Sequence, residues 1–132
     1  MAGMDMASRQ RSERSFAGRS AQLSGLAAEE IALRLYRDAR LVEARWRCPE
    51  GEIDLILVSP GQVVFVEVKA RRNRDLAAWS LTRRQRARIG AAAACYLSKA
   101  EDAAVNVRFD VVLVDGLGCA ERIENAFDYE VA

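Results

Sequence analysis

Two short apolar segments in the middle of the chain constrain its fold more than any other feature. Residues 52–58 (EIDLILV) and 63–69 (VVFVEVK) have the length and the β-branched content of strands, and residues 59–62 (SPGQ) between them form a turn sequence. The sequence therefore predicts a β-hairpin. Because both segments are nearly continuous apolar runs, we expect the sheet to be covered on both faces.

The flanking sequence predicts an α/β domain around this hairpin. A helix with one apolar face should run from Ser24 to near Asp38, and Thr82 with Gln85 fits a capping box at the start of a second, longer helix. Further strands are expected at residues 41–46 and 107–114, with a short segment at 119–123. The predicted order is αβββαβ, with a mixed central sheet flanked by helices. We expect a disordered basic tail at 1–20 and one domain at 21–132.

Composition excludes several kinds of chemistry. The chain has no histidine, which excludes Ser/His/Asp and Cys/His nucleophile systems. Cys48, Cys95 and Cys119 are widely spaced and form no CxxC pair, so they predict neither a disulfide framework nor a zinc site. No apolar run is long enough to cross a bilayer or resembles a signal peptide, so we expect a cytoplasmic protein without a membrane partner.

Charge is distributed unevenly along the chain. Between residues 69 and 88 there are eight basic residues and one acidic residue, a formal charge of +7 in a chain whose total is only +1. Such a stripe is typical of a surface that binds a polyanion, although a solvated arginine-rich face is the alternative. The candidate nucleic-acid-binding residues are Arg71, Arg72, Arg74, Arg83, Arg84, Gln85, Arg86 and Arg88.

The predicted hairpin also positions its charged residues. A symmetric turn centred on residues 60 and 61 places Asp54 directly across from Glu67, and Glu52 across from Lys69. Directly opposed side chains have Cβ atoms about 5 Å apart. Strand alternation puts Glu52 and Asp54 on one face of the sheet, and it puts the intervening apolar residues on the other face: Ile53, Leu55 and Leu57.

Two opposed carboxylates in an apolar sheet repel each other unless a positive charge lies between them. Oxygen ligands without histidine or thiolate favour Mg²⁺ or Mn²⁺, so Asp54 and Glu67 are candidate metal ligands. Lys69 would then orient an attacking water or stabilise charge on a phosphoryl oxygen. Glu29, on the inner half of the first helix, is a candidate third ligand, whereas Glu30 should face solvent. The alternative is a solvated, self-neutralised charge network.

The motifs GEIDLI and VFVEVK, followed by RFDVV at 108–112, resemble the YraN-like family of bacterial proteins from about Gly25 to Phe127. That family is similar to PD-(D/E)XK nucleases, particularly archaeal Holliday-junction resolvases. The resemblance implies a restriction-endonuclease-like fold, with catalytic residues at the acid, acid and lysine positions and at the helix-one glutamate: Asp54, Glu67, Lys69 and Glu29. The family usually has an asparagine near Arg45 and a lysine near Gln85.

These observations lead to two hypotheses. The first is a Mg²⁺-dependent endonuclease that recognises structured or branched DNA by shape through phosphate contacts. Resolvase-like enzymes often work as dimers, so a homodimer is left open. The second is a non-catalytic nucleic-acid-binding or assembly module that retains the nuclease fold, which the missing lysine near Gln85 favours.

Overall fold

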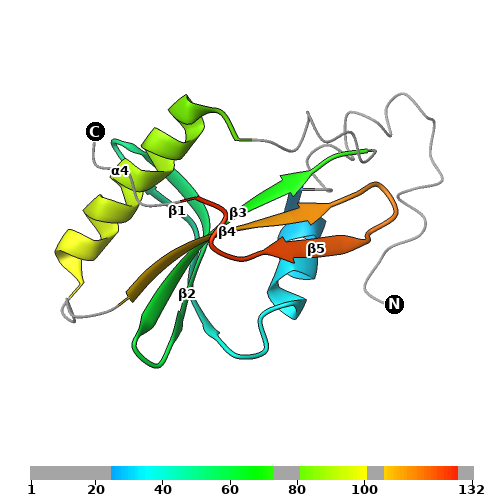
Figure 1. Cartoon of the computed structure of the whole chain (residues 1–132), viewed down its shortest axis with the longest axis horizontal. Coiled ribbons are helices and arrows are strands. Elements are labelled where there is room, and N and C mark those ends of the chain that lie inside the picture. Colours follow the sequence, from blue (N-terminus) through cyan, green and yellow to red (C-terminus); the bar gives the residue numbers. More distant parts are fainter. Residues whose placement is uncertain (1–24, 73–80, 101–105, 128–132) are drawn as a thin grey trace.

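A computed structural model describes residues 25–72, 81–100 and 106–127. Its centre is a five-stranded sheet with strand order β1-β2-β3-β4-β5, in which β3 and β4 are parallel and the other neighbours antiparallel. The strands are β1 (Arg40–Cys48), β2 (Gly51–Ser59), β3 (Gln62–Ala70), β4 (Asn106–Val114) and β5 (Ala120–Ile123). The N-terminal helix (residues 25–34) and α4 (Arg83–Lys99) flank this sheet (Figure 1). The predicted restriction-endonuclease-like α/β architecture is confirmed.

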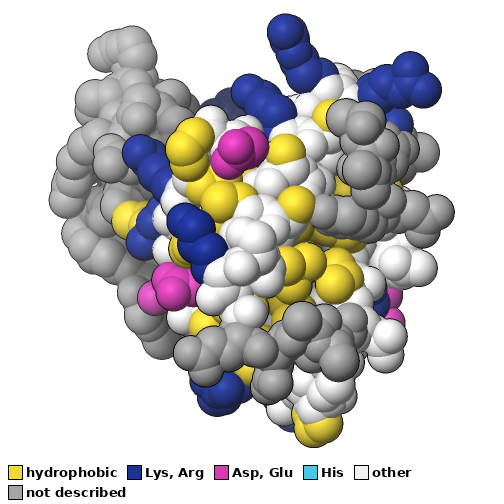
Figure 2. Space-filling model, turned by 90° about the vertical axis from the view of Figure 1, so that its left-hand side faces the viewer, with side chains coloured by type: hydrophobic (Ala, Val, Ile, Leu, Met, Phe, Trp, Pro, Cys, Tyr) yellow, Lys and Arg dark blue, Asp and Glu magenta, His cyan; other side chains and the backbone are white. Residues whose placement is uncertain are grey.

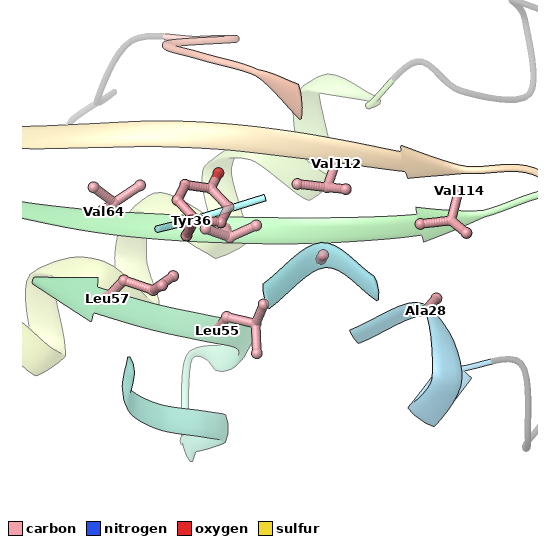
Figure 3. Close-up of a cluster of buried hydrophobic side chains, with 9 residues drawn as sticks. Ala28, Tyr36, Leu55, Leu57, Val64, Val112 and Val114 are labelled. Atoms are coloured by element: carbon pink, nitrogen blue, oxygen red, sulfur yellow. The ribbon is translucent and has the colours of Figure 1, made fainter. Parts of the chain in front are cut away.

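Each helix covers its own apolar cluster. The N-terminal helix packs Ala28 and Ala32 against residues of β2, β3 and β4 that include Leu55, Val64 and Val112 (Figure 3). The helix α4 packs Ile89, Ala92 and Ala93 against the cluster that contains Ile53, Ile56, Val63, Phe65 and Phe109. Val63 and Val64 thus belong to opposite clusters, which is the alternation expected of a strand covered on both faces. Within the described residues, no helix is long and apolar enough to span a membrane.

The hairpin between β2 and β3 has the predicted register. Ser59 pairs with Gln62 and Leu55 with Val66, and Gly61 in the turn has a φ of 73°. Glycine adopts a positive φ at almost no cost in conformational energy, whereas the backbone of a residue with a side chain would be strained here. The backbone N–H of Asn106 donates to the carbonyl of Gly61 at 2.9 Å, so the turn also supports the start of β4.

The two helix termini differ in how well they were predicted. Thr82 and Gln85 form the predicted capping box, with hydrogen bonds of 2.8 and 3.0 Å. The N-terminal helix ends at residue 34, so the predicted end near Asp38 is wrong. The N–H groups of Leu35 and Tyr36 each donate three residues back, which tightens the last turn and closes the helix early. Ser24, Arg74 and the tail at 1–20 lie outside the described residues.

A buried ionic network fixes the end of this helix to the sheet. Asp110 in β4 is fully buried, and its carboxylate accepts hydrogen bonds from the Tyr36 hydroxyl at 2.7 Å and from Arg108 at 2.8 Å. The backbone N–H of Asn125 donates a further bond at 2.9 Å. Burial, together with the bond to Asp110, raises the pKa of Tyr36. Arg108 and Asp110 are therefore a structural pair within the fold.

Candidate metal centre

The ladder between β2 and β3 ends at the pair Leu55–Val66. Beyond that pair the two strands are joined by a side chain, because the carboxylate of Asp54 accepts a hydrogen bond of 2.8 Å from the backbone N–H of Val68. Since the ladder stops before it reaches Asp54 and Glu67, the predicted cross-strand pairings of Asp54 with Glu67 and of Glu52 with Lys69 are both wrong. Asp54 is thus held at the point where the strands separate.

The same point interrupts the alternation of β2. Ile53 packs in the cluster under α4, while Leu55 and Leu57 pack under the N-terminal helix, so the prediction that the three share a face is wrong. The neighbouring strand is irregular at the same level, because Arg45 in β1 has a φ of 51°. A left-handed residue between the pairs Ala44–Leu55 and Trp46–Ile53 changes the direction of the side chains that follow.

Asp54 lies near Glu67, because its carboxylate binds the N–H of Val68, the residue that follows Glu67 in β3. Burial, followed by the nearby charge of Asp54, raises the pKa of Glu67 to about 8. Burial also raises the pKa of Asp54, although the N–H of Val68 counteracts this effect. Glu67 therefore retains its proton near neutral pH, because two carboxylate charges in a partly desolvated site repel each other.

Lys69 follows Glu67 by two residues in β3, and only 5% of its surface is exposed. Burial and the positive charge of Arg71 lower its pKa, while the carboxyl group of Glu67 opposes this shift. A buried ammonium with a depressed pKa releases its proton more readily than a solvated lysine. The split between the strands thus brings two acids and one lysine into one neighbourhood.

Glu29 approaches this neighbourhood from the N-terminal helix. Its carboxylate is bound by the guanidinium of Arg45, and burial followed by the charges of Asp54 and Glu52 raises its pKa, which Arg45 partly offsets. Within the described residues Glu29 does not join Asp54 and Glu67 in a tight three-carboxylate cluster. The neighbouring Glu30 is exposed, as predicted.

Arg45 was not among the predicted site residues. The feature of the sequence that could have indicated it is the asparagine that the family usually has near this position. Asparagine adopts left-handed backbone conformations more readily than other non-glycine residues. Here the residue with the left-handed backbone is Arg45, and its positive charge acts on both Glu29 and Asp54. Glu52, by contrast, forms an exposed ion pair of 3.4 Å with Arg47.

The predicted basic stripe divides into exposed and engaged residues. Arg83, Arg84 and Arg88 are exposed on α4, and Arg72 is exposed after β3. Figure 2 views the molecule from the left of Figure 1 and shows basic side chains projecting from the rim of that face around an apolar area. Other members of the stripe bind the protein itself: Arg71 donates to the carbonyl of Ala70, Arg86 to that of Leu81, and Gln85 is held in the capping box.

Comparison with known proteins assigns the sequence to a family. A family model described as "Uncharacterised protein family UPF0102" matches residues 28–114. The chain belongs to the UPF0102 family. The matched residues include the acids Glu29, Asp54 and Glu67 as well as Lys69, and they extend from the N-terminal helix to the end of β4. The resemblance to the YraN-like family is thereby confirmed.

Individual UPF0102 proteins align over most of their lengths. A UPF0102 protein of Ruegeria pomeroyi is 51% identical over 110 residues, which cover 81% of this chain and 89% of that protein. A second, from Ruegeria sp., is 44% identical over 115 residues, or 85% of this chain and 93% of that protein. One from Bradyrhizobium sp. is 42% identical over 108 residues, or 80% and 77% of the two chains.

Proposed function

We propose that this UPF0102 protein is a divalent-metal-dependent nuclease that hydrolyses phosphodiester bonds in structured or branched DNA. The observation that carries the proposal is the position of Asp54 where β2 and β3 separate: its carboxylate binds the N–H of Val68, which lies in β3 between Glu67 and the buried Lys69. Acids are costly to bury as a pair, so a site of this kind is expected to serve a chemical purpose.

The residues of the site fit a hard cation. Carboxylate oxygens are the ligands at hand, and neither imidazole nor thiolate accompanies them, which favours Mg²⁺ or Mn²⁺ over zinc. The raised pKa of Glu67 supports this assignment, because a divalent charge would let both acids ionise at neutral pH. When bound, such a cation polarises a phosphoryl oxygen and lowers the pKa of a coordinated water.

The protein residues then have separate roles in the proposed reaction. Asp54 and Glu67 hold the cation, and the N–H of Val68 fixes the orientation of Asp54. Lys69 orients the attacking water and balances negative charge that develops on the phosphate. Glu29 is the third carboxylate, and it becomes available to the cation or its hydration shell when Arg45 releases it.

The exposed arginines support a nucleic-acid substrate. Arg72 follows the strand that carries Lys69, and Arg83 and Arg84 lie at the start of α4, whose first turn contains no acidic residue. Cations there add to the positive end of the helix dipole, which favours phosphate groups. Phosphate contacts carry no base sequence, so we expect recognition of DNA shape and a strong dependence on salt.

The test is cleavage of a labelled four-way DNA junction and of a linear duplex of the same composition, with Mg²⁺, with Mn²⁺ and with a chelator. We expect metal-dependent cleavage by the wild type, no cleavage by Asp54→Asn or Glu67→Gln, and retained DNA binding in both variants. Glu30→Gln is the matched control, because Glu30 is an exposed acid one residue from Glu29. Size-exclusion chromatography with light scattering tests whether the active form is a homodimer.

A non-catalytic DNA-binding or assembly module is the second candidate. Two features of Gln85 favour it. The side chain of Gln85 is engaged in the capping box, and the family usually has a lysine near this position. Wild-type protein that binds the junction under all metal conditions and never cuts it would select this candidate.

A further inference from the structure

Two cysteines and a glutamate that are distant in the sequence converge at the far end of β1. Cys48 is the last residue of β1, Glu50 lies in the turn before β2, and Cys95 lies in α4. Their sulfur and carboxylate oxygen atoms all lie within 4.8 Å of one another. Within the described residues, this is the one group of three potential metal ligands that lie so close together.

The surrounding structure holds these residues in place. The turn lies directly against α4, because a Cβ atom at Gly51 would be 3.5 Å from the carbonyl oxygen of Arg88. Arg88 and Cys95 are seven residues apart, so they lie two turns apart on the same side of the helix. On β1, the ring of Trp46 packs edge-on against Tyr96 with centroids 5.5 Å apart. The group is thus built from two elements that are already packed together.

The cluster is accessible from solvent. Cys48 and Cys95 are half-buried and Glu50 is exposed, so an ion can enter from solvent.

We propose that Cys48, Cys95 and Glu50 form a second metal site, selective for a thiolate-binding divalent cation of the zinc class. Two sulfurs with one carboxylate favour zinc over Mg²⁺, which prefers oxygen ligands alone. Tetrahedral coordination with zinc–sulfur bonds of about 2.3 Å places the two sulfurs about 3.8 Å apart, which the observed cluster accommodates. The fourth position is open to solvent. Binding releases the protons of the two thiols to solvent and joins α4 to the turn between β1 and β2.

This site is independent of the proposed nuclease centre. It uses other residues, another ligand chemistry and another cation, and its bound ion would hold the helix that carries Arg83 and Arg84 against the edge of the sheet. The expected consequence is a higher melting temperature, because an ion that binds only the folded chain stabilises it.

The experiment is a titration of the full-length, metal-free, reduced chain with Co²⁺ as a spectroscopic substitute for zinc. We expect one ion to bind per chain, with a thiolate-to-cobalt charge-transfer band and the visible bands of tetrahedral Co²⁺. Zn²⁺ should displace the Co²⁺ and raise the melting temperature, and Mg²⁺ should do neither. Cys48→Ser and Cys95→Ser should each weaken binding at least about tenfold, and Glu50→Gln should weaken it while keeping the charge-transfer band.

Cys119→Ser is the matched control, because Cys119 is an exposed cysteine outside the cluster. It should bind Co²⁺ and Zn²⁺ as the wild type does. Circular dichroism verifies that each serine variant is folded, and the Cys48→Ala/Cys95→Ala pair replaces any serine variant that is not. Three results would overturn the proposal: no cobalt bands in the wild type, bands that persist in a folded double variant, or thiol titration showing that Cys48 and Cys95 form a disulfide under the reducing conditions used.

Discussion

The carboxylate of Asp54 accepts a hydrogen bond of 2.8 Å from the backbone N–H of Val68, at the point where the ladder between β2 and β3 stops. A side chain here satisfies a main-chain donor that an uninterrupted ladder would pair with a carbonyl group. The charge of the same carboxyl group raises the pKa of the neighbouring Glu67. Asp54 therefore stabilises the separation of the strands and also forms half of the acidic pair, and the two roles require different substitutions to distinguish them.

Asp54→Asn and Asp54→Ala separate these roles. Both variants remove the charge, but the amide oxygen of asparagine can still accept from the N–H of Val68, whereas alanine leaves that donor without this partner. We expect Asp54→Ala to be about 1–3 kcal/mol less stable than Asp54→Asn, and neither to be stabilised by millimolar Mg²⁺. Urea denaturation with and without Mg²⁺ measures both effects. Equal stability of the two variants would contradict the structural role.

The sequence predicted those features of the site that depend on local rules. The pairing of β2 with β3 follows from the turn at Gly61, and the capping box follows from the spacing of Thr82 and Gln85. These are local interactions in the chain, so neighbouring residue types determine them. The same rules place Asp54 near Glu67 but overstate the regularity of the hairpin, because the ladder ends at Leu55–Val66 and Asp54 binds the N–H of Val68 instead.

The features that the sequence did not predict depend on tertiary structure or on a break in regular geometry. Alternation assumes a continuous pleat, so it placed Ile53 on the wrong face once the strands became irregular at Asp54 and Arg45. The approach of Cys95 to Cys48 depends on how α4 lies across the sheet, and the wide spacing of the two cysteines in the sequence gave no indication of it.

Stability should fall with rising pH in the absence of divalent cations. The pKa of Glu67 is raised from its ordinary 4.5 to about 8 in the folded chain, so between these values the unfolded chain ionises while the folded chain keeps its proton. The folded state then binds more protons, and Glu67 alone lowers the free energy of unfolding by at most about 1.4 kcal/mol per pH unit. Asp54, whose pKa is also raised, acts in the same direction. Below the lower value both states are protonated and the effect vanishes.

Glu67→Gln should remove most of this pH dependence, and millimolar Mg²⁺ should remove it in the wild type by compensating both charges. Thermal unfolding at a series of pH values, with and without the cation, provides the comparison. Glu30→Gln should keep the wild-type profile, because Glu30 is exposed. A wild-type profile that rises with pH through this range would contradict the raised pKa of Glu67.

Arg108→Ala should be strongly destabilising. Its guanidinium binds Asp110 through two bonds of 2.8 Å, and Asp110 is fully buried, so the variant leaves a buried charge without its ionic partner. We expect a loss of about 3 kcal/mol or more. Arg47→Ala is the control, because its 3.4 Å pair with Glu52 is exposed and should contribute less than about 0.5 kcal/mol. Comparable losses of unfolding free energy in the two variants would show that the buried network contributes no more to stability than an exposed ion pair.

Arg83→Gln and Arg84→Gln should weaken binding to a DNA junction without affecting stability. Both side chains are exposed at the start of α4, and each phosphate contact that is lost should reduce the slope of log affinity against log salt by about 1. Lys99→Gln, in the last turn of the same helix, is the matched exposed control. Arg86→Gln should instead lower stability, because the Arg86 guanidinium binds the carbonyl of Leu81 at 2.8 Å. Unchanged affinity in the double Arg83/Arg84 variant would exclude this face of α4 as the DNA contact.

Arg45→Asn tests whether Glu29 takes part in cation binding. Arg45 has a φ of 51°, which asparagine also adopts, so the backbone should be retained while the guanidinium that binds Glu29 is lost. Without metal, Glu29 would face the charges of Asp54 and Glu52 with no counter-ion, and we expect lower stability than in the wild type. With Mg²⁺ the released carboxylate can contribute to binding, so half-maximal stabilisation should require less Mg²⁺. Arg45→Lys keeps the charge and should resemble the wild type. If melting curves show the same Mg²⁺ dependence for Arg45→Asn and the wild type, then Glu29 is a structural partner of Arg45 and the cation is held by Asp54 and Glu67 alone.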